Sequence, residues 1–165
     1  MSSDRLHQIK DSLNRLGEQL GGKQKAKDLA PLEEKVRIDQ QIKEIRWDIC
    51  QLNQEYFQIL GERSTELVIE ESEAEPIIAE FVEQVGKLEV RQTAPYPDEI
   101  MQILREILDK VNQPGTTAAA QLKAVISSMP PFISLSYEAG LDTENFLRQY
   151  FPKFSKWVQA FTKKS

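Results

Sequence analysis

The feature that most constrains this chain is a row of apolar residues spaced alternately three and four positions apart. The row consists of Ile38, Ile42, Ile45, Ile49, Leu52, Tyr56 and Ile59. This spacing is the heptad pattern of a helix that packs along another helix. It predicts one long helix over residues 32–60, of roughly eight turns at about 3.6 residues per turn. We take the row as the candidate interaction seam.

A second heptad row precedes the first one. It contains Leu6, Ile9, Leu13, Leu16 and Leu20, with Ser3 and Asp4 as helix-start residues and Gly21 and Gly22 as the predicted end. Residues 21–31 are predicted to form a basic loop, so the two helices fold back as an antiparallel hairpin. Because the first predicted helix is about half as long as the second, the unmatched part needs another helix or another chain. We therefore expect self-association, most simply as a dimer.

The rest of the chain shows the apolar period of further helices, over residues 77–88, 100–111 and 118–129. The predicted fold class is all-α, with a coiled-coil hairpin over residues 1–72 and a small helical domain over residues 73–165. Two alternatives stay open for residues 61–76: either the long helix continues through Leu67 and Ile69, or it stops near Gly61 and a short β-prone run follows. Pro76 is expected to mark the start of the next helix.

The stretch SMPPFISLSYEAG, residues 128–140, differs from the charged sequence around it. The paired Pro130 and Pro131 are expected to end a helix and to force an extended path. Its alternating pattern predicts that Ile133, Leu135 and Tyr137 form one buried face. We expect these three side chains to pack under the last, aromatic helices.

Charge is unevenly distributed along the chain. Residues 1–60 carry ten acids and ten bases, residues 61–99 eleven acids and three bases, and residues 100–165 five acids and eight bases. Binding to duplex nucleic acid needs a basic face that displaces counterions, so we expect no such partner. The acidic run of Glu70, Glu71, Glu73 and Glu75 is expected to be a solvated segment before a helix, with cation binding as the alternative.

Few residues are available for catalysis. His7 is the single histidine, which excludes a Ser-His-Asp triad or a two-histidine metal site within one chain. There is no Gly-rich phosphate loop. We therefore predict no catalytic residue, no cofactor and no metal. Cys50 is the single cysteine, so no internal disulfide can form, and we expect it to be an inert thiol that is buried or half-buried. The chain shows no leader and no lipid anchor, so we expect a cytoplasmic location.

The C-terminal segment mixes aromatic and basic side chains. We single out Tyr150, Phe154, Lys156, Trp157 and Phe161 as a candidate partner or lipid surface. Because Phe154, Trp157 and Phe161 recur at helical spacing, burial in the core is the leading interpretation. The alternatives are a partner surface, anionic lipid or single-stranded bases. A membrane-acting effector whose residues 122–137 and C-terminus engage lipid is the alternative function.

Two segments resemble a known group of proteins. They are APLEEKVRIDQQIKEIRWDICQLNQEYFQIL and LKAVISSMPPFISLSYEAGLDTENFLRQYFPKF. They resemble the helical effector-associated modules of cyanobacterial multidomain proteins, some of which carry pentapeptide repeats. The pattern is carried by Glu33, Glu34, Lys35, Arg37, Ile38, Gln41, Ile42, Ile45, Asp48, Ile49, Glu55, Tyr56 and Leu60. The resemblance implies an adaptor that pairs like with like and brings effectors to STAND or NACHT-type NTPases. We accordingly expect a non-enzymatic adaptor that self-associates and recruits a signalling or effector protein.

Overall fold

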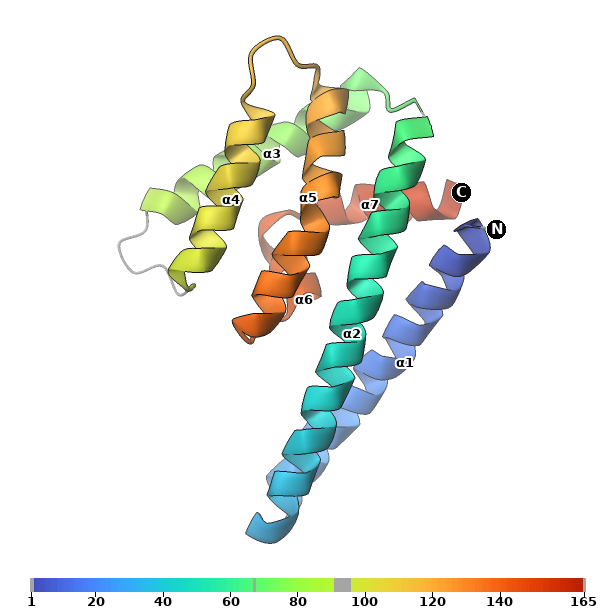
Figure 1. Cartoon of the computed structure of the whole chain (residues 1–165), viewed down its shortest axis with the longest axis vertical. Helices are drawn as coiled ribbons and strands as arrows, with labels where there is room; N and C mark the ends of the chain where they lie inside the picture. The colour runs from blue at the N-terminus through green and yellow to red at the C-terminus, as the bar shows by residue number, and fades with distance from the viewer. Residues whose placement is uncertain (1, 67, 91–95, 165) are drawn as a thin grey trace.

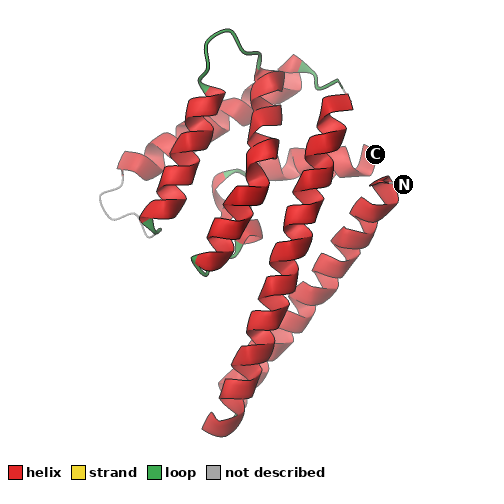
Figure 2. Ribbon diagram, viewed as in Figure 1, coloured by secondary structure: helices red, strands yellow, loops and turns green. Residues whose placement is uncertain are grey.

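The fold consists of helices only in the part of the chain that the structure describes. This computed structural model describes residues 2–66, 68–90 and 96–164, with no side-chain description for residues 2, 3 and 164. The helices are α1 (Ser2–Leu29), α2 (Leu32–Glu66), α3 (Glu71–Val90), α4 (Asp98–Val111), α5 (Ala118–Glu138), α6 (Thr143–Tyr150) and α7 (Pro152–Lys164). The prediction of an all-α protein is confirmed. Figure 2 shows the helices joined by loops, with no strand drawn in the described segments.

Helices α1 and α2 form a long antiparallel hairpin. Near its open end Arg5 Nε lies 2.5 Å from Glu55 Oε2, and near its closed end Lys27 Nζ lies 2.6 Å from Asp39 Oδ1. The upper half of the hairpin lies beside the other helices, whereas the lower half projects away from them (Figure 1). The fold therefore has a compact body and one projecting arm.

The predicted end of the first helix is wrong. Instead of stopping at Gly21 and Gly22, α1 continues to Leu29. A glycine ends a helix by taking up the left-handed conformation, and in the described segments the glycines with positive φ are Gly115 and Gly140. With 28 residues in α1 and 35 in α2, the two helices are of similar length. The expectation of a half-length first helix, from which we argued for association, is therefore also wrong.

The long second helix is confirmed, and it extends beyond the heptad row. It continues six residues past Leu60, to Glu66, and residues 68–70 then form neither helix nor strand. Leu67 lies outside the described residues. Helix α3 begins at Glu71 rather than at Pro76, because the Glu70 carbonyl accepts the N–H groups of Glu73 and Ala74. Pro76 is thus inside α3, and the expectation that it starts the helix is wrong.

The two consecutive prolines do not break α5. The helix passes through Pro130 and Pro131 to Glu138, so the predicted extended path is wrong. An interior proline removes a backbone hydrogen bond and costs roughly 3 kcal/mol. Burial offsets this cost, because Met129, Phe132 and Ile133 beside the prolines are at most 2% exposed. Tertiary packing therefore outweighs the local signal.

Helix α5 lies at the centre of the body. It packs against α2, α3, α4 and α6, and Figure 1 shows it between α4 and α2, with α7 crossing the body and with α6 near the lower end of α5. Buried side chains from α1 to α7, from Leu6 to Val158, form one continuous hydrophobic cluster. The upper part of the hairpin therefore shares its core with the C-terminal helices.

The acidic first half of α3 holds neighbouring helices in place. Glu71 accepts the N–H groups of Ala118 and Ala119 at the start of α5, both at 2.9 Å. Glu73 accepts the indole N–H of Trp157 on α7 at 3.0 Å. The expectation that this run is only solvated charge is therefore wrong for Glu71 and Glu73. Carboxylates at helix starts satisfy N–H groups that have no partner inside the helix.

Candidate interaction surface

The predicted interaction seam lies inside the protein's own hairpin. Of its members, Ile38, Ile45 and Tyr56 are buried, and Ile42, Ile49, Leu52 and Ile59 are half-buried. Helix α1 packs along α2 and contributes the fully buried Leu6 and Ile9. The sequence thus identified a packing row, but its partner is mainly α1. These residues are not free to join two chains unless the hairpin opens.

A second row on α2 faces α5. The Trp47 ring makes an edge-on contact with the Tyr137 ring at 5.5 Å, and Gln54 Nε2 donates to the Pro130 carbonyl at 3.2 Å. Gly61 lies against the Ile126 side chain. These three α2 positions are seven residues apart. Because they are an aromatic, an amide and a glycine, no apolar pattern revealed the row in the sequence.

Helix α2 extends into the projecting arm beyond the end of α5. The face of α2 that packs against α5 in the body is therefore uncovered in the arm. An adjacent seven-residue row consists of Val36, Lys43, Cys50, Phe57 and Ser64. Its last three members are buried, but Val36 and Lys43 are exposed. The change occurs where α5 ends, since Tyr137, one residue before the last of α5, already contacts Trp47.

The uncovered part of this face carries exposed apolar side chains beside the polar Gln40 and the charged Glu33 and Lys43. Leu32 is 82% exposed, Val36 is 73% exposed and Trp47 is 50% exposed, and Leu29 at the end of α1 is 88% exposed. We call these four residues the arm face. The arm face was not predicted from the sequence, because Leu32 and Val36 fall outside the heptad seam and exposure cannot be read from spacing alone.

The C-terminal aromatic residues belong mainly to the core. Tyr150, Phe154 and Trp157 are each less than 10% exposed and Phe161 is partly buried, whereas Lys156 is exposed. Phe154 stacks on Phe57 of α2 with ring centroids 6.2 Å apart. Burial is thus the correct interpretation of the aromatic rings. A partner or lipid surface formed by these rings would require them to leave the core, because protein atoms cover them in this structure.

The stretch at residues 128–140 is buried, but with helical rather than alternating spacing. Phe132, Ile133 and Ser136 are at most 1% exposed, and Leu135 and Tyr137 are half-buried. Phe132 contacts Phe146 of α6, while Tyr137 contacts Trp47 of α2. The expectation that Leu135 and Tyr137 share one fully buried face under the last helices is therefore wrong. The proposed lipid-engaging residues 122–137 form most of the central helix.

The two titratable residues singled out from the sequence, Cys50 and His7, differ in burial. Cys50 is buried, as expected, and desolvation together with the nearby Glu138 charge raises the pKa of its thiol. His7 is exposed. Within the described ranges, no three His, Cys, Asp or Glu side chains gather as a metal site would require. None of the helices in those ranges has the length and apolar content needed to cross a bilayer.

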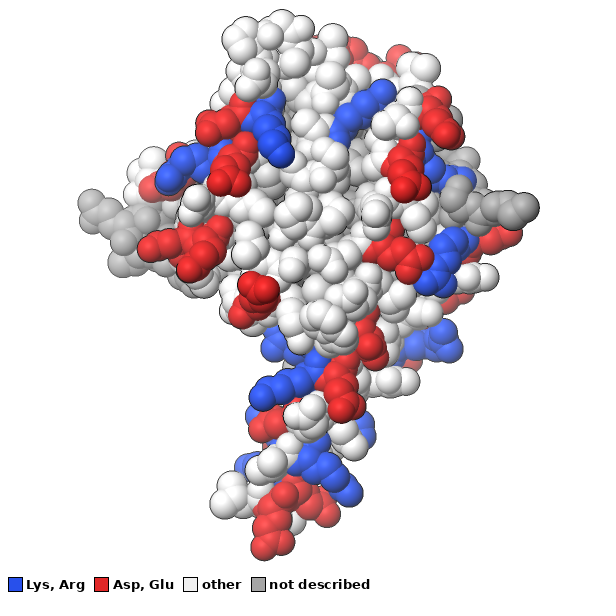
Figure 3. All heavy atoms as spheres, in the orientation of Figure 1, with Lys and Arg blue, Asp and Glu red and all other residues white. Residues whose placement is uncertain are grey.

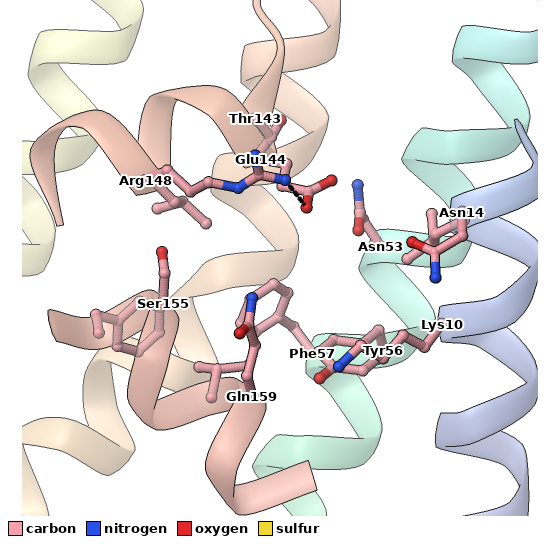
Figure 4. A pocket seen from close by; sticks show the side chains of 14 residues that line it. Lys10, Asn14, Asn53, Tyr56, Phe57, Thr143, Glu144, Arg148, Ser155 and Gln159 are labelled. Atoms are coloured by element: carbon pink, nitrogen blue, oxygen red, sulfur yellow. Dashed lines mark hydrogen bonds and ion pairs between the residues drawn. The ribbon is translucent and has the colours of Figure 1, made fainter. Parts of the chain in front are cut away.

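A pocket lies where α1, α2, α6 and α7 meet (Figure 4). Its volume is about 110 Å³. The apolar part of the wall consists of Leu13, Tyr56, Phe57, Leu147, Phe154 and Val158, and the polar part of Lys10, Asn14, Asn53, Thr143, Glu144, Arg148, Ser155 and Gln159. In Figure 4, Glu144 and Arg148 lie at one end, and Lys10 and Gln159 lie toward the other. None of these residues was singled out as a pocket from the sequence.

Comparisons of the chain with protein-family models, with curated proteins and with solved structures found no match.

Proposed function

We propose that this protein is a non-enzymatic helical interaction module that forms a dimer through the arm face. The observation that carries the proposal is the continuation of the α5-covered face of α2 into an arm where Leu32 and Val36 are 82% and 73% exposed. The seam predicted from the sequence is occupied by α1, so the proposed contact uses the neighbouring face instead.

A cluster of exposed apolar residues indicates an interaction surface, whereas a single exposed one does not. Single exposed leucines are common on soluble proteins. Here Leu32 and Val36 lie one helical turn apart at the start of α2, Leu29 is the last residue of α1, and Trp47 extends the same face of α2 toward the body. Covering one such side chain contributes about 1.5–3 kcal/mol when burial is complete. Covering the arm face is therefore a driving force for association.

The charges of the arm favour a second copy of the chain as the partner. Residues 17–46 carry six acidic and seven basic side chains, and Figure 3 shows the two signs interspersed on the projecting part. Because the arm surface is nearly neutral and carries both signs of charge, two copies of the arm can come into contact without strong electrostatic repulsion. A two-fold contact also pairs each patch with itself. Two arms lying side by side would then form a four-helix arrangement.

The recruitment of another protein is the second half of the proposal. The resemblance of residues 30–60 to effector-associated modules supports an adaptor that brings a signalling or effector protein to its own kind. A cytoplasmic location fits the single cysteine, Cys50, which a reducing compartment would keep as a thiol. A dimer would present two copies of any partner-binding surface on the body, which raises the effective concentration of the recruited protein.

The experiment compares matched pairs of substitutions by light scattering over a range of concentrations. Leu32→Glu combined with Val36→Glu places two charges on the arm face. We expect at least a tenfold weaker dimer, with the helical content of wild type retained because both side chains are exposed.

The control places the same charges on the body. Val68 and Val90 are 90% and 81% exposed, so Val68→Glu combined with Val90→Glu makes the same chemical change away from the arm. The control protein should dimerise as wild type does. Equal effects of the two double substitutions, or no effect of the arm pair, would contradict the proposed dimer contact.

A further inference from the structure

The pocket between α1, α2, α6 and α7 carries one positive charge that is not balanced within its wall. Its charged residues are Lys10, Glu144 and Arg148. Arg148 Nη2 pairs with a Glu144 oxygen one helical turn away, so these two neutralise each other. Lys10 is half-buried and makes no ion pair with any residue that the structure describes. The wall is therefore complementary to a ligand with one negative charge.

The polar side chains around the pocket are available for hydrogen bonding. Asn14, Asn53, Ser155 and Gln159 make no side-chain hydrogen bond within the described part of the chain. The three amides each carry an NH₂ donor, and the serine carries a hydroxyl. Figure 4 shows these four side chains and Lys10 arranged around one space, with contributions from α1, α2 and α7. Small-molecule sites combine apolar side chains with placed polar groups, and this wall has six residues of the first kind and eight of the second.

The apolar part of the wall has room for one branched alkyl group, or for one ring that stays only partly enclosed. A closed cavity of about 150 Å³ lined by Leu, Ile and Phe takes up benzene, and this pocket has about 110 Å³ and opens to solvent beside its polar residues. Tyr56 turns its hydroxyl away from solvent toward Thr162, with which it shares a hydrogen bond. The Tyr56 ring is therefore held in place as part of the wall, together with Phe57 and Phe154.

We propose that this pocket binds a small amphipathic monocarboxylate. Its apolar body lies against Phe57, Phe154 and the aliphatic residues of the wall. Its carboxylate lies toward Lys10, away from Glu144, which lies at the opposite end of the pocket in Figure 4. Lys10 supplies the countercharge, and the amide group of Asn14, one helical turn from Lys10 on α1, supplies a hydrogen bond to a carboxylate oxygen. This site is independent of the arm face and of the proposed dimer.

Three small molecules of similar shape, one negative, one neutral and one positive, test the proposal. They are 3-phenylpropanoate, 3-phenylpropanamide and 3-phenylpropylamine, titrated into the full chain while the methyl resonances of Leu13, Leu147 and Val158 are followed by NMR. We expect the carboxylate to shift these resonances and to bind at least tenfold more tightly than the amide or the amine.

Substitutions of Lys10 provide the controls. Lys10→Met keeps most of the side-chain volume and should lower the affinity for the carboxylate to that for the amide, whereas Lys10→Arg should retain the preference. Lys156→Met removes an exposed lysine that does not line the pocket and should change nothing. Equal binding of all three probes, tighter binding of the amine, no methyl shift with any probe, or an unchanged preference in Lys10→Met would each overturn the proposal.

Discussion

The Glu80 carboxylate accepts the backbone N–H of Lys153, which lies 3.1 Å from Oε1 and 3.2 Å from Oε2. Glu80 is in the middle of α3 and only 8% exposed, and Lys153 is the second residue of α7. The N–H groups of a first helical turn have no partner within the helix, and the helix dipole favours a negative charge beside them. Glu80 thus fixes the start of α7 to α3, as Glu71 fixes the start of α5.

Removal of the Glu80 carboxylate should weaken the packing of α7. Glu80→Ala leaves a partly buried N–H without its acceptor, so we expect the free energy of unfolding to fall by about 1–3 kcal/mol. Urea denaturation followed by circular dichroism measures the change. Glu75→Ala on the same helix is the control, because Glu75 is exposed and should change stability by less than about 0.5 kcal/mol. A Glu80→Ala protein as stable as the Glu75→Ala protein would refute this role of Glu80.

Replacement of glycine by alanine should have opposite effects on stability at Gly22 and at Gly115. At Gly22, inside α1, an added Cβ meets nothing within 4 Å, so Gly22→Ala should stabilise the protein by roughly 0.5–1 kcal/mol through helix propensity. Gly115 has φ +81°, a conformation in which alanine is strained, so Gly115→Ala should destabilise it. Thermal unfolding of the two variants checks both signs. A loss of stability in Gly22→Ala would show that α1 does not continue through this glycine.

Burial of Cys50 predicts slow thiol chemistry. Since desolvation raises the pKa of Cys50 above its usual value, the native thiol ionises at higher pH than the unfolded one. Its contribution to stability is therefore full below the unfolded pKa, and it declines as pH rises through the native pKa. We expect iodoacetamide to modify native Cys50 at least tenfold more slowly than the urea-unfolded chain at pH 8. Similar rates in the two states would contradict the burial of Cys50.

The presence of helices where apolar residues recur at helical spacing was predicted correctly from the sequence. The heptad row from Ile38 to Ile59 correctly indicated a long helix, because burial against a neighbouring helix imposes this spacing directly. The helical spacing of Phe154, Trp157 and Phe161 likewise indicated burial, which the ring stack of Phe154 on Phe57 illustrates.

Glycine and proline residues that commonly end helices led to wrong predictions of helix ends. Gly21, Gly22 and the Pro130–Pro131 pair were expected to end helices, yet α1 and α5 continue through them. Their local cost is a few kcal/mol at most, and long-range packing offsets it. The bonds from Glu71 and Glu80 to distant helix starts had no signal in the sequence, because each joins residues at least 47 positions apart.

The candidate sites were the least predictable part. The arm face depends on where α5 ends beside Trp47, and the pocket on how α6 and α7 meet the hairpin. Both are properties of tertiary arrangement. An apolar row alone does not reveal whether its partner is a helix of the same chain or of another one.

The molar mass of the wild-type protein in solution tests the central claim most directly. Light scattering on the full chain, from low micromolar to several hundred micromolar protein, should show a mass that rises toward twice the 19.0 kDa of one chain. A mass that stays at 19.0 kDa over the whole range would contradict self-association through the arm face.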